Sequence, residues 1–578
     1  MSTSTDPLLP TSAASASREQ RSSLDTERDI SNYSDFVAGK LGLTTWWTTL
    51  TRAGVILGLS LVLGLVVRWV DGHLKDRIPV QVILMVSDGF GPASQTLARN
   101  YATHVSQIQT LALDSILVGA SRTRSSNSFV TDSAAGATAF SCALKSYNGA
   151  IGVAPDQSPC GTVLEAAKLA GYLTGHVSTS RVTHATPASF SSHVIDRGME
   201  DEIAVQQIGN YTLGRMADLI LGGGSCHFKP QRDGPSSSCR QDNNDLIAAA
   251  QSAYGWNYLD NVNDFRNEAL SLPLLGLFTA DHMAYEIDRD SAKEPSLTEM
   301  AMKALQLLSD NAKKQNRGFF VMIEGSRIDM AAHSNDPASH VREILAYNEA
   351  IAAVIDWVDK HPNTVMISVS DHETGGLSVA HQRNGSYPVY EWFPSVLVPV
   401  KKSTESLGNM IAAFVEPFNP PVFQQFIHQI ITDQLGITDV TADELAFMQT
   451  PNRTTSAYTD YMGKMVSDRA GLGWATHGHS AVDVNLYAHG YKSAELRGNH
   501  ENTDIGAFIE RTMGINLKST TAKLLGGEQK VSSEGDGWWS RVQAAYKLFV
   551  EKKGRVNANP TADAFAEIHY HEQSIVTK

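Results

Sequence analysis

The sequence predicts a three-layer α/β fold, in which a central, mostly parallel β-sheet carries helices on both faces, preceded by one N-terminal transmembrane helix. Three apolar runs, 80–87, 319–323 and 364–370, indicate buried strands, and an acidic residue follows each of them. The stretch 338–360, between the last two, has apolar residues at helical spacing. Buried strand, helix and buried strand in succession indicate a βαβ unit of a doubly wound sheet.

The composition is that of a globular protein with a large core, since 42% of the 578 residues are hydrophobic and 19% are charged. The net charge of −14 argues against a nucleic-acid partner, because binding to a phosphate backbone needs clustered Lys and Arg. An acidic enzyme can still act on a phosphate substrate where bound metal ions supply positive charge locally.

Near the start of the chain, residues 53–67 carry no charge, and Arg52 and Arg68 bracket them. A spanning helix needs about 20 residues, a length that 48–70 reaches if both arginines extend to the membrane surfaces. About fifty residues precede this run and no small-residue cleavage site follows it, so we predict an uncleaved signal anchor, with 71–78 as a linker. The alternative is a helix buried in the protein core.

The segment 1–47 is rich in Ser, Thr and Asp, and we expect it to be a disordered cytoplasmic tail. It contains Leu8-Leu9 after an aspartate, which has the form of an acidic dileucine sorting signal for an adaptor; an accidental Leu pair is the alternative. Beyond the anchor lie three glycosylation sequons, where a lumenal domain would carry them; a fourth, at Asn32, precedes the anchor and would be a chance match. The three are Asn210, Asn384 and Asn452.

The acids that follow the three predicted strands are Asp88, Glu324 and Asp371. In open α/β sheets the ligand site lies beyond the carboxyl ends of the strands, so the three carboxylates should converge. One acid after a strand is commonly a helix cap, but three acids at three strand ends are harder to explain in that way. Converged carboxylates repel one another unless a cation lies among them, and the sequence therefore predicts a metal cluster.

Further candidate ligands lie close to these acids. Asp329 and His333 are four residues apart, so a helical turn places them on one face. His372 directly follows Asp371, and two late imidazoles occur at His477 and His479. Oxygen and nitrogen ligands without sulfur suit zinc in an open, catalytic coordination, whereas an all-oxygen subset suits magnesium. Each pair alone could be structural, but together they favour a metal centre.

Ser133 is the candidate nucleophile. It follows Asp132 and begins a run of small residues, 134–139, that would let a helix pack closely on the sheet. Free amides and the helix dipole favour an anion at such a position. A serine there could simply cap the helix, but beside a metal cluster its hydroxyl can be activated as an alkoxide. Downstream, His184, Thr186 and Arg197 add an imidazole, a hydroxyl and a guanidinium that could clamp a phosphoryl group; a solvated surface charge is the alternative for Arg197.

None of the four cysteines belongs to a CxxC pair, which excludes a Cys-rich zinc module. The short separations within two pairs, 18 and 13 residues, suggest two local disulfides if the domain lies in an oxidising compartment. Four buried thiols in a reducing compartment are the alternative. The residues are Cys142, Cys160, Cys226 and Cys239.

Six motifs in one order make the chain resemble the alkaline phosphatases, and within that family the anchored vacuolar enzymes of fungi in particular. They are VSDGFG, VTDSAAGATA, HATPA followed by Arg197, EGSRIDMAAH, SDHETGG and HGHS. The resemblance covers residues 79–514 and implies a catalytic domain at 79–515. It also implies phosphomonoester hydrolysis through a phosphoserine, with two zinc ions and one magnesium ion per chain.

The resemblance implies a role for each site residue. The first zinc would be held by Asp329, His333 and His479, and the second by Asp88, Asp371 and His372. Magnesium would be held by Asp88, Thr186 and Glu324. Ser133 would attack phosphorus, Arg197 would orient the phosphoryl group, Asp132 would support Arg197, and His477 would contact a ligand from behind. Two positions depart from the bacterial pattern: His184 replaces an Asp, which puts magnesium affinity in doubt, and Met330 replaces a Lys, which removes a phosphate contact.

Other functions and the remaining segments are less defined. A phosphodiesterase or phosphotransferase of the same superfamily, or an inactive membrane-tethered relative, is the alternative to a phosphomonoesterase. We expect a helix at 300–317 and an irregular insert at 385–469, which by resemblance covers the site and meets a second subunit of a homodimer. The segment 516–578 contains a Trp-Trp pair and a charged helical stretch, and proteolysis could remove it. The resemblance implies a single-pass type II protein of the vacuole membrane with a lumenal catalytic domain.

Overall fold

The computed structural model describes residues 79–556 except 235–236, 267–268, 383–384, 386, 415–419 and 532–537. The predicted tail, the anchor at 48–70, the linker, Leu8-Leu9, Asn32, Asn384 and the end of the chain after 556 lie outside the described residues. Within the described part, no helix is both long and apolar enough to cross a membrane.

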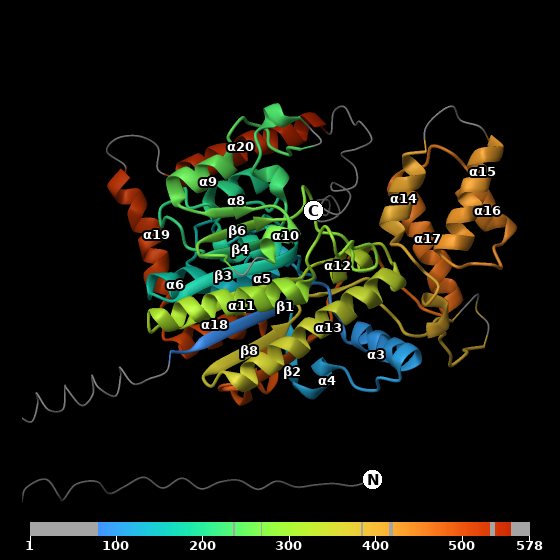
Figure 1. The fold of residues 1–578 in the computed structure, drawn as a ribbon, viewed down its shortest axis with the longest axis horizontal. Coiled ribbons are helices and arrows are strands. Elements are labelled where there is room, and N and C mark those ends of the chain that lie inside the picture. Colours follow the sequence, from blue (N-terminus) through green and yellow to red (C-terminus); the bar gives the residue numbers. More distant parts are fainter. Residues whose placement is uncertain are drawn as a thin grey trace, which may run out of the picture. The chain divides into compact units, whose positions relative to one another are not determined.

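A ten-stranded sheet organises these residues (Figure 1). Along the sheet the strands are β12 (Gly498–Glu501), β2 (Leu117–Arg122), β11 (Val484–Gly490), β8 (Thr364–Val369), β1 (Gln81–Ser87), β7 (Phe319–Gly325), β3 (Leu173–Arg181), β4 (Leu219–Gly223), β6 (Leu274–Leu277) and β5 (Asn257–Leu259).

The sheet is mostly parallel, as predicted. Only β11 runs against its neighbours, β8 and β2, while the other described pairs are parallel. The three strands predicted to end in acids are β8, β1 and β7, which are adjacent in the sheet. Val86 of β1 lies opposite both Glu324 and Val369, so the three strands end at the same edge. This edge is where the carboxylates were expected to converge.

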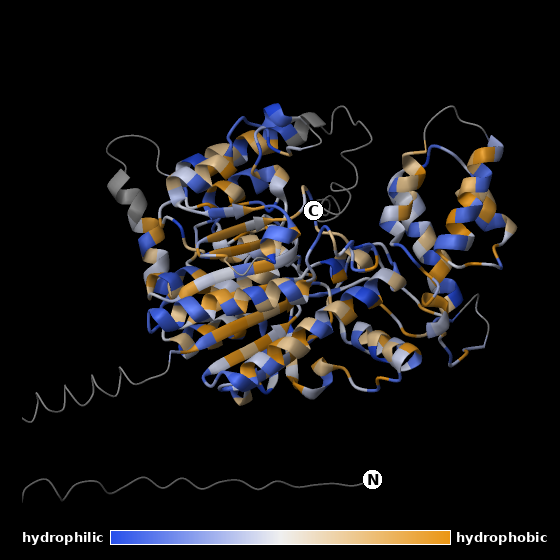
Figure 2. Ribbon diagram, in the orientation of Figure 1, coloured by the Kyte–Doolittle hydropathy of each residue, from blue (hydrophilic) through white to orange (hydrophobic). Residues whose placement is uncertain are grey.

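Helices cover both faces because successive side chains of a strand point to opposite faces. In β1, Val82, Leu84 and Val86 pack into one apolar cluster, and Ile83 and Met85 into another. Figure 2 shows the central strands as mainly hydrophobic, whereas many of the helices mix hydrophilic and hydrophobic residues. The first cluster includes α5 (Ser133–Cys142), α6 (Val163–Leu169), α7 (Ala185–Ser191) and α18 (Asn502–Met513); the second includes α3 (Pro92–Ser106), α11 (Leu297–Lys314) and α13 (Pro337–Lys360).

Shorter elements join these layers. The predicted helix at 300–317 is α11, which begins and ends three residues earlier. The others are α4 (Ala112–Ser115), α8 (Glu200–Gln207), α9 (Leu246–Tyr254), α10 (Val262–Phe265), α12 (Arg327–His333), η1 (Ser225–His227), η2 (Gln231–Asp233), η3 (Pro394–Leu397), η5 (Ser493–Leu496) and the pair β9 (Glu373–Thr374) and β10 (His479–Ser480).

The expectation that 385–469 is irregular is wrong, because much of it is helical. The helices are α14 (Thr404–Ala412), α15 (Pro420–Gln429) with η4 (Ile430–Gln434), α16 (Ala442–Met448) and α17 (Thr455–Ala470), drawn together in Figure 1. Several are too short to show a helical period in the sequence, yet each of α14, α16 and α17 is capped by a Ser or Thr side chain. The capping residues Ser403, Thr441 and Thr454 were the available signal.

Both predicted local disulfides are present, Cys142–Cys160 and Cys226–Cys239. The segment after 516 forms α19 (Leu517–Val531) and α20 (Trp538–Val556). Trp538, Trp539 and Val542 of α20 are buried in the same apolar cluster as α5 and α7. The described part of the C-terminal extension therefore packs on the helical layer that covers one face of the sheet.

Candidate active site

Three fully buried carboxylates, those of Asp88, Glu324 and Asp371, lie at the carboxyl ends of β1, β7 and β8. The loop after Asp88 turns sharply at Gly89, whose φ is +74°. A Cβ atom at Gly89 would lie 2.7 Å from the Cα atom of Asp329, so only glycine lets α12 approach this strand end. The Asp-Gly pair after β1 thus brings a fourth carboxylate to the cluster.

The ligand atoms of Asp329, His372 and His479 form one group and lie within 4.8 Å of one another. His333 also belongs to this corner, because its Nε2 atom is 3.3 Å from Asp329 Oδ2 and 3.2 Å from His479 Nε2. The rings of His372 and His479 stack, with centroids 3.5 Å apart. The structure therefore brings together the three residues predicted for the first zinc, with His372 beside them.

Two further groups share Asp88. Asp88, Asp371 and His372 form one, and Asp88, His184 and Glu324 form the other, with ligand atoms again within 4.8 Å. The first matches the residues predicted for the second zinc. The second contains two of the three predicted magnesium ligands; the third, Thr186, is the second residue of α7 and is buried.

Buried polar atoms without hydrogen bonds test whether these residues fit metal ions. Within the described part of the chain, no hydrogen bond reaches either carboxylate oxygen of Asp88 or of Asp371, Glu324 Oε1, or Thr186 Oγ1. Buried polar atoms are rarely left without partners, so a missing ligand is the simplest explanation for such a concentration. These atoms are carboxylate oxygens and one hydroxyl oxygen, which are ligands that suit cations.

The histidine side chains also fit a metal site. Nδ1 of His333 donates to the carbonyl oxygen of His477 at 2.5 Å, and Nδ1 of His479 donates to that of Thr131 at 2.7 Å. In the neutral form of each ring these hydrogen bonds keep the proton on Nδ1 and leave the Nε2 lone pair available to a metal. These two lone pairs face each other at 3.2 Å, an arrangement that a shared cation would stabilise.

The carboxyl groups respond to this crowding. Burial, and then the neighbouring charges of Asp371, Asp329 and Glu324, raise the pKa of Asp88 well above its usual value. Burial is also the main cause that raises the pKa of Glu324 to about 8, and the charge of Asp371 adds to it. Burial favours the neutral form of Asp329 as well, but His333, His479 and His372 outweigh it and hold the pKa of this carboxyl well below its usual range. A bound cation would keep all of them ionised.

Ser133 is the first residue of α5, and its buried Oγ atom lies 3.0 Å from Nε2 of His372. The helix is capped by Asp132, whose Oδ1 atom accepts a hydrogen bond from the backbone N–H of Ala135 at 2.9 Å. The structure thereby rejects the alternative that Ser133 is the cap. A Cβ atom at Gly136 would lie 2.9 Å from Cβ of Asp371, so the small residues let α5 pack on the strand end, as predicted.

Arg197 reaches the same helix terminus. Its Nη1 atom is 3.3 Å from Asp132 Oδ2, and its Nη2 atom donates to His184 Nε2 at 3.0 Å. Burial and the charges of Arg197 and Arg181 hold the pKa of His184 well below its usual value, so this ring stays neutral and can accept that hydrogen bond. The predicted support of Arg197 by Asp132 is present, and His184 adds a second one.

Other contributors were missed from the sequence. Thr374 Oγ1 donates to Asp329 Oδ1 at 2.5 Å and lies 3.2 Å from Nδ1 of His372, so it orients a ligand of each of two groups. Its position two residues after His372 was the available signal. Thr131 acts through its backbone carbonyl oxygen, which no side-chain pattern reveals. His477, which was predicted to contact a ligand, does so through its own carbonyl oxygen, which accepts from His333. The exposed ring of His477 also contacts the backbone, with Nδ1 at 2.7 Å from the carbonyl oxygen of His333.

One apparent metal group is excluded. Cys226, His227 and Cys239 lie close enough to hold an ion, but the two sulfur atoms are joined in a disulfide and are not available as thiolates.

Known proteins resemble this chain over most of its length. The family model described as alkaline phosphatase matches residues 80–515. The repressible alkaline phosphatase of Saccharomyces cerevisiae is 49% identical over 466 residues, which cover 76% of this chain and 82% of the relative. The alkaline phosphatase of Schizosaccharomyces pombe is 44% identical over 485 residues, which cover 83% of this chain and 90% of the relative.

Solved structures agree. The alkaline phosphatase of Thermus thermophilus has a TM-score of 0.65 at 28% identity, covering 78% of this chain and 96% of that one. A cold-active enzyme from Shewanella has a TM-score of 0.63 at 31% identity, covering 75% and 99%. A His-to-Glu variant of the enzyme from the Antarctic bacterium TAB5, with magnesium in its M3 site, has a TM-score of 0.52 at 27% identity, covering 76% and 99%.

Proposed function

We propose a mechanism for this chain, which belongs to the alkaline phosphatase family and is a metal-dependent phosphomonoesterase: Ser133 attacks the phosphorus of the substrate and forms a phosphoserine. The observation that carries the proposal is the buried Ser133 hydroxyl, 3.0 Å from His372, at a helix N-terminus beside the three carboxylate groups. An anion is favoured there by the free amides and the helix dipole.

The metals proposed are two zinc ions and one magnesium ion. Asp329, His333 and His479 would hold the first zinc; Asp88, Asp371 and His372 the second; and Asp88, Thr186 and Glu324 the magnesium. When bound, such ions lower the pKa of a coordinated hydroxyl and offset the negative charge of the phosphoryl oxygens. His184 beside Asp88 and Glu324 adds a nitrogen to the third site, and the TAB5 variant that holds magnesium has lost a histidine. The choice between zinc and magnesium at this site is therefore the first to test.

The reaction has two steps, formation of the phosphoserine and its hydrolysis. Arg197, held by Asp132 and His184, binds two oxygens of the phosphoryl group and fixes the phosphorus in front of Ser133. The Ser133 hydroxyl gives its proton to water as its oxygen bonds to phosphorus, and the bond to the leaving alcohol breaks as that oxygen takes a proton from water. Hydroxide from water then attacks the phosphoserine, which releases inorganic phosphate and restores the hydroxyl.

A Ser133→Ala variant tests the nucleophile. We expect its turnover of p-nitrophenyl phosphate to fall by more than about 10³-fold, with no labelled phosphoserine trapped in acid. Ser141→Ala is the matched control, since Ser141 lies on the same helix and bonds only within it and to its neighbour. A Ser133→Ala protein with full activity would overturn the mechanism, and turnover of bis(p-nitrophenyl) phosphate above that of the monoester would favour the phosphodiesterase alternative.

Metal content is tested separately. A chelator should remove the activity, and zinc together with magnesium should restore it, with two zinc ions and one magnesium ion per chain in the active protein. Full activity in the stripped protein, or recovery with magnesium alone, contradicts this assignment.

The location and assembly are also proposals. The uncharged run at 53–67 supports a single-pass type II protein of the vacuole membrane, with the catalytic domain in the lumen and Leu8-Leu9 available to a sorting adaptor. Asn210 and Asn452 are exposed, which suits glycosylation in the lumen. Disulfides suit the same compartment, and by family resemblance the enzyme is a homodimer. Glycosidase treatment of the native protein should shift its mass, and the shift should shrink in Asn210→Gln and Asn452→Gln variants; no shift would count against the lumen.

A further inference from the structure

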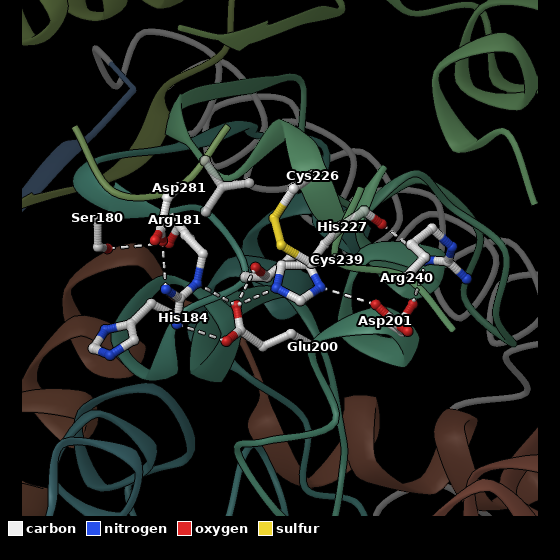
Figure 3. Close-up of polar contacts among 12 residues, drawn as sticks. Ser180, Arg181, His184, Glu200, Asp201, Cys226, His227, Cys239, Arg240 and Asp281 are labelled. Carbon is white, nitrogen blue, oxygen red and sulfur yellow. Dashed lines mark hydrogen bonds and ion pairs between the residues drawn. A yellow bond between two sulfur atoms is a disulfide. The ribbon is translucent and has the colours of Figure 1, made fainter. Parts of the chain in front are cut away.

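Arg197 is held on the substrate side by Asp132 and His184, but its own chain segment also has a support. Helix α8 begins at Glu200, three residues after Arg197. The first two side chains of this helix, Glu200 and Asp201, belong to a polar network with Arg181 and His227 (Figure 3).

Glu200 ties the segment after Arg197 to the segment before His184. Arg181 forms a two-pronged pair with it, donating from Nε to Oε2 at 2.9 Å and from Nη2 to Oε1 at 2.8 Å. Thr183, the residue before His184, donates to Oε2 at 2.5 Å. His184 in turn bonds Arg197 at 3.0 Å. The segment 183–184 is therefore tied both to the Arg197 guanidinium, through His184, and to Glu200 just after Arg197, through Thr183.

The Cys226–Cys239 disulfide lies directly behind this helix terminus, as Figure 3 shows. His227, next to Cys226, contacts both acids, with Nδ1 at 2.8 Å from Asp201 Oδ1 and Nε2 at 3.4 Å from Glu200 Oε2. Two carboxylates around one imidazole favour its charged form; burial opposes this, but the charges of Glu200 and Asp201 raise the pKa of His227 above its usual value.

Arg240, next to Cys239, contacts the same helix start from the second strand of chain that the disulfide joins; we call the segments around Cys226 and Cys239 the two arms of the disulfide. It is only 2% exposed, and its Nη1 atom donates to the carbonyl oxygens of His227 at 2.8 Å and Asp201 at 3.0 Å. The backbone N–H of Gln241 donates to Asp201 Oδ2 at 3.0 Å. Both arms of the disulfide therefore bear on the same helix turn.

We propose that the Cys226–Cys239 disulfide, with His227 and Arg240 on its two arms, is a positioning device for the phosphate-binding arginine, acting on Arg197 through Glu200 and Asp201. The inference rests on the proposed role of Arg197. The physical reason is that a phosphoryl clamp works only in a narrow geometry, in which a displacement of about 1 Å can cost 10²-fold in rate. Without the covalent link the two arms can separate, and the start of α8 loses its shared anchor.

The test is a Cys226→Ser/Cys239→Ser double variant, measured by kcat, KM and the inhibition constant of inorganic phosphate. We expect the phosphate inhibition constant and KM to rise by about 10-fold. A disulfide that only stabilises the fold would lower the active fraction, and with it kcat, but would leave the phosphate inhibition constant unchanged; that result overturns the proposal.

A double-mutant cycle with Arg197→Ala separates this inference from the proposed function. Arg197→Ala alone should weaken phosphate binding, and adding the two serines should cause no further change. An equal fold-change in both backgrounds would show that the disulfide does not act through Arg197. If Arg197→Ala alone leaves phosphate binding intact, the proposed role of Arg197 fails, and the inference with it.

Two single variants keep the test decisive if the double variant folds poorly. His227→Ala preserves the disulfide but removes its contacts to Glu200 and Asp201, and should raise the phosphate inhibition constant in the same direction by a smaller factor. Arg232→Ala is the matched control, because Arg232 lies in the same loop, is exposed and, among the residues that the structure describes, pairs its guanidinium only with Asp245, at 3.9 Å. Equal effects of the two variants would overturn the proposal.

Discussion

Glu324 and Asp88 are buried carboxyl groups whose nearest charged neighbours include other carboxylates. In water such groups ionise at a low pH, but here burial and mutual repulsion favour the protonated form. The chain therefore folds its catalytic centre at a cost in stability that a cation can remove. This links metal binding to the stability of the fold as well as to activity.

The first prediction concerns the pH dependence of the metal-free protein. The pKa of Glu324 is about 8 in the fold, above the value of 4.5 expected in the unfolded chain. Between these values the folded state binds a proton that the unfolded state lacks, so the free energy of unfolding should fall as the pH rises from about 4.5 to about 8. Thermal melting of the stripped protein across this range should show the decline.

Glu324→Gln should make that decline shallower, because an amide cannot ionise. Some slope should persist, since the pKa of Asp88 is raised too. A variant with the same slope as the natural chain would rule out Glu324 as its source, and zinc with magnesium should raise the melting temperature most at the alkaline end.

At the scale of elements, helix α14 contacts α12, which carries the candidate metal ligands Asp329 and His333, at its start and just beyond its end. Before Asp329, the buried Arg327 pairs with Glu405 of α14 at 3.1 Å and stacks on the ring of Tyr285 at 3.6 Å. After His333, Asp336 accepts a hydrogen bond from the backbone N–H of Thr404 at 2.8 Å. The insert therefore contacts the chain on both sides of the two candidate metal ligands in α12, Asp329 and His333.

Glu405→Ala should weaken the contact between α14 and the start of α12. It leaves the buried Arg327 charge without its ion-pair partner, although the Tyr285 ring, Met330 and the charge of Glu343 remain. Because Glu405 is itself partly exposed, we expect a loss of about 1 kcal/mol. The activity should also decay faster in a chelator. Glu444→Ala is the matched control, since its pair with Arg469 lies within the insert; equally fast decay in both variants would contradict a specific role for Glu405.

At the scale of the whole molecule, the C-terminal helix α20 forms part of the helical layer over the sheet. The Trp538 ring packs edge-on against Tyr211 and His193, with centroids 5.8 Å and 6.0 Å away. His193 in turn lies 2.8 Å from the buried carboxylate of Glu165. Removal of this helix by proteolysis would expose that surface, so trimming and stability should be coupled.

Trp538→Ala should therefore lower the free energy of unfolding by about 3 kcal/mol, because it deletes a large buried side chain. Leu548→Ala, on the same helix but 63% exposed, should change it by no more than about 0.5 kcal/mol. Urea unfolding of the two variants compares them directly. Similar midpoints would mean that α20 does not contribute to the folded core.

The sequence by itself determined the sheet, the acids at the ends of β1, β7 and β8, and the family. Long buried strands and the acids that follow them are local patterns, which can be recognised in the sequence without a structure. It also indicated that Asp132 and Ser133 lie at a helix start, but not which of them caps the helix. The expectation for 385–469 was wrong because most of its helices, with the exception of the 16-residue α17, are short. Short helices are stabilised by packing rather than by their own sequence.

Only the tertiary structure decided which groups meet. The two roles of Thr374, the carbonyl oxygens of Thr131 and His477, and the network from Cys226 to Glu200 join residues far apart in the chain. Such contacts depend on where the fold brings backbone and side chains together, and backbone carbonyls carry no residue-type signal. The candidate ligands could thus be named from the sequence, whereas the contacts that support them follow from the packing around them.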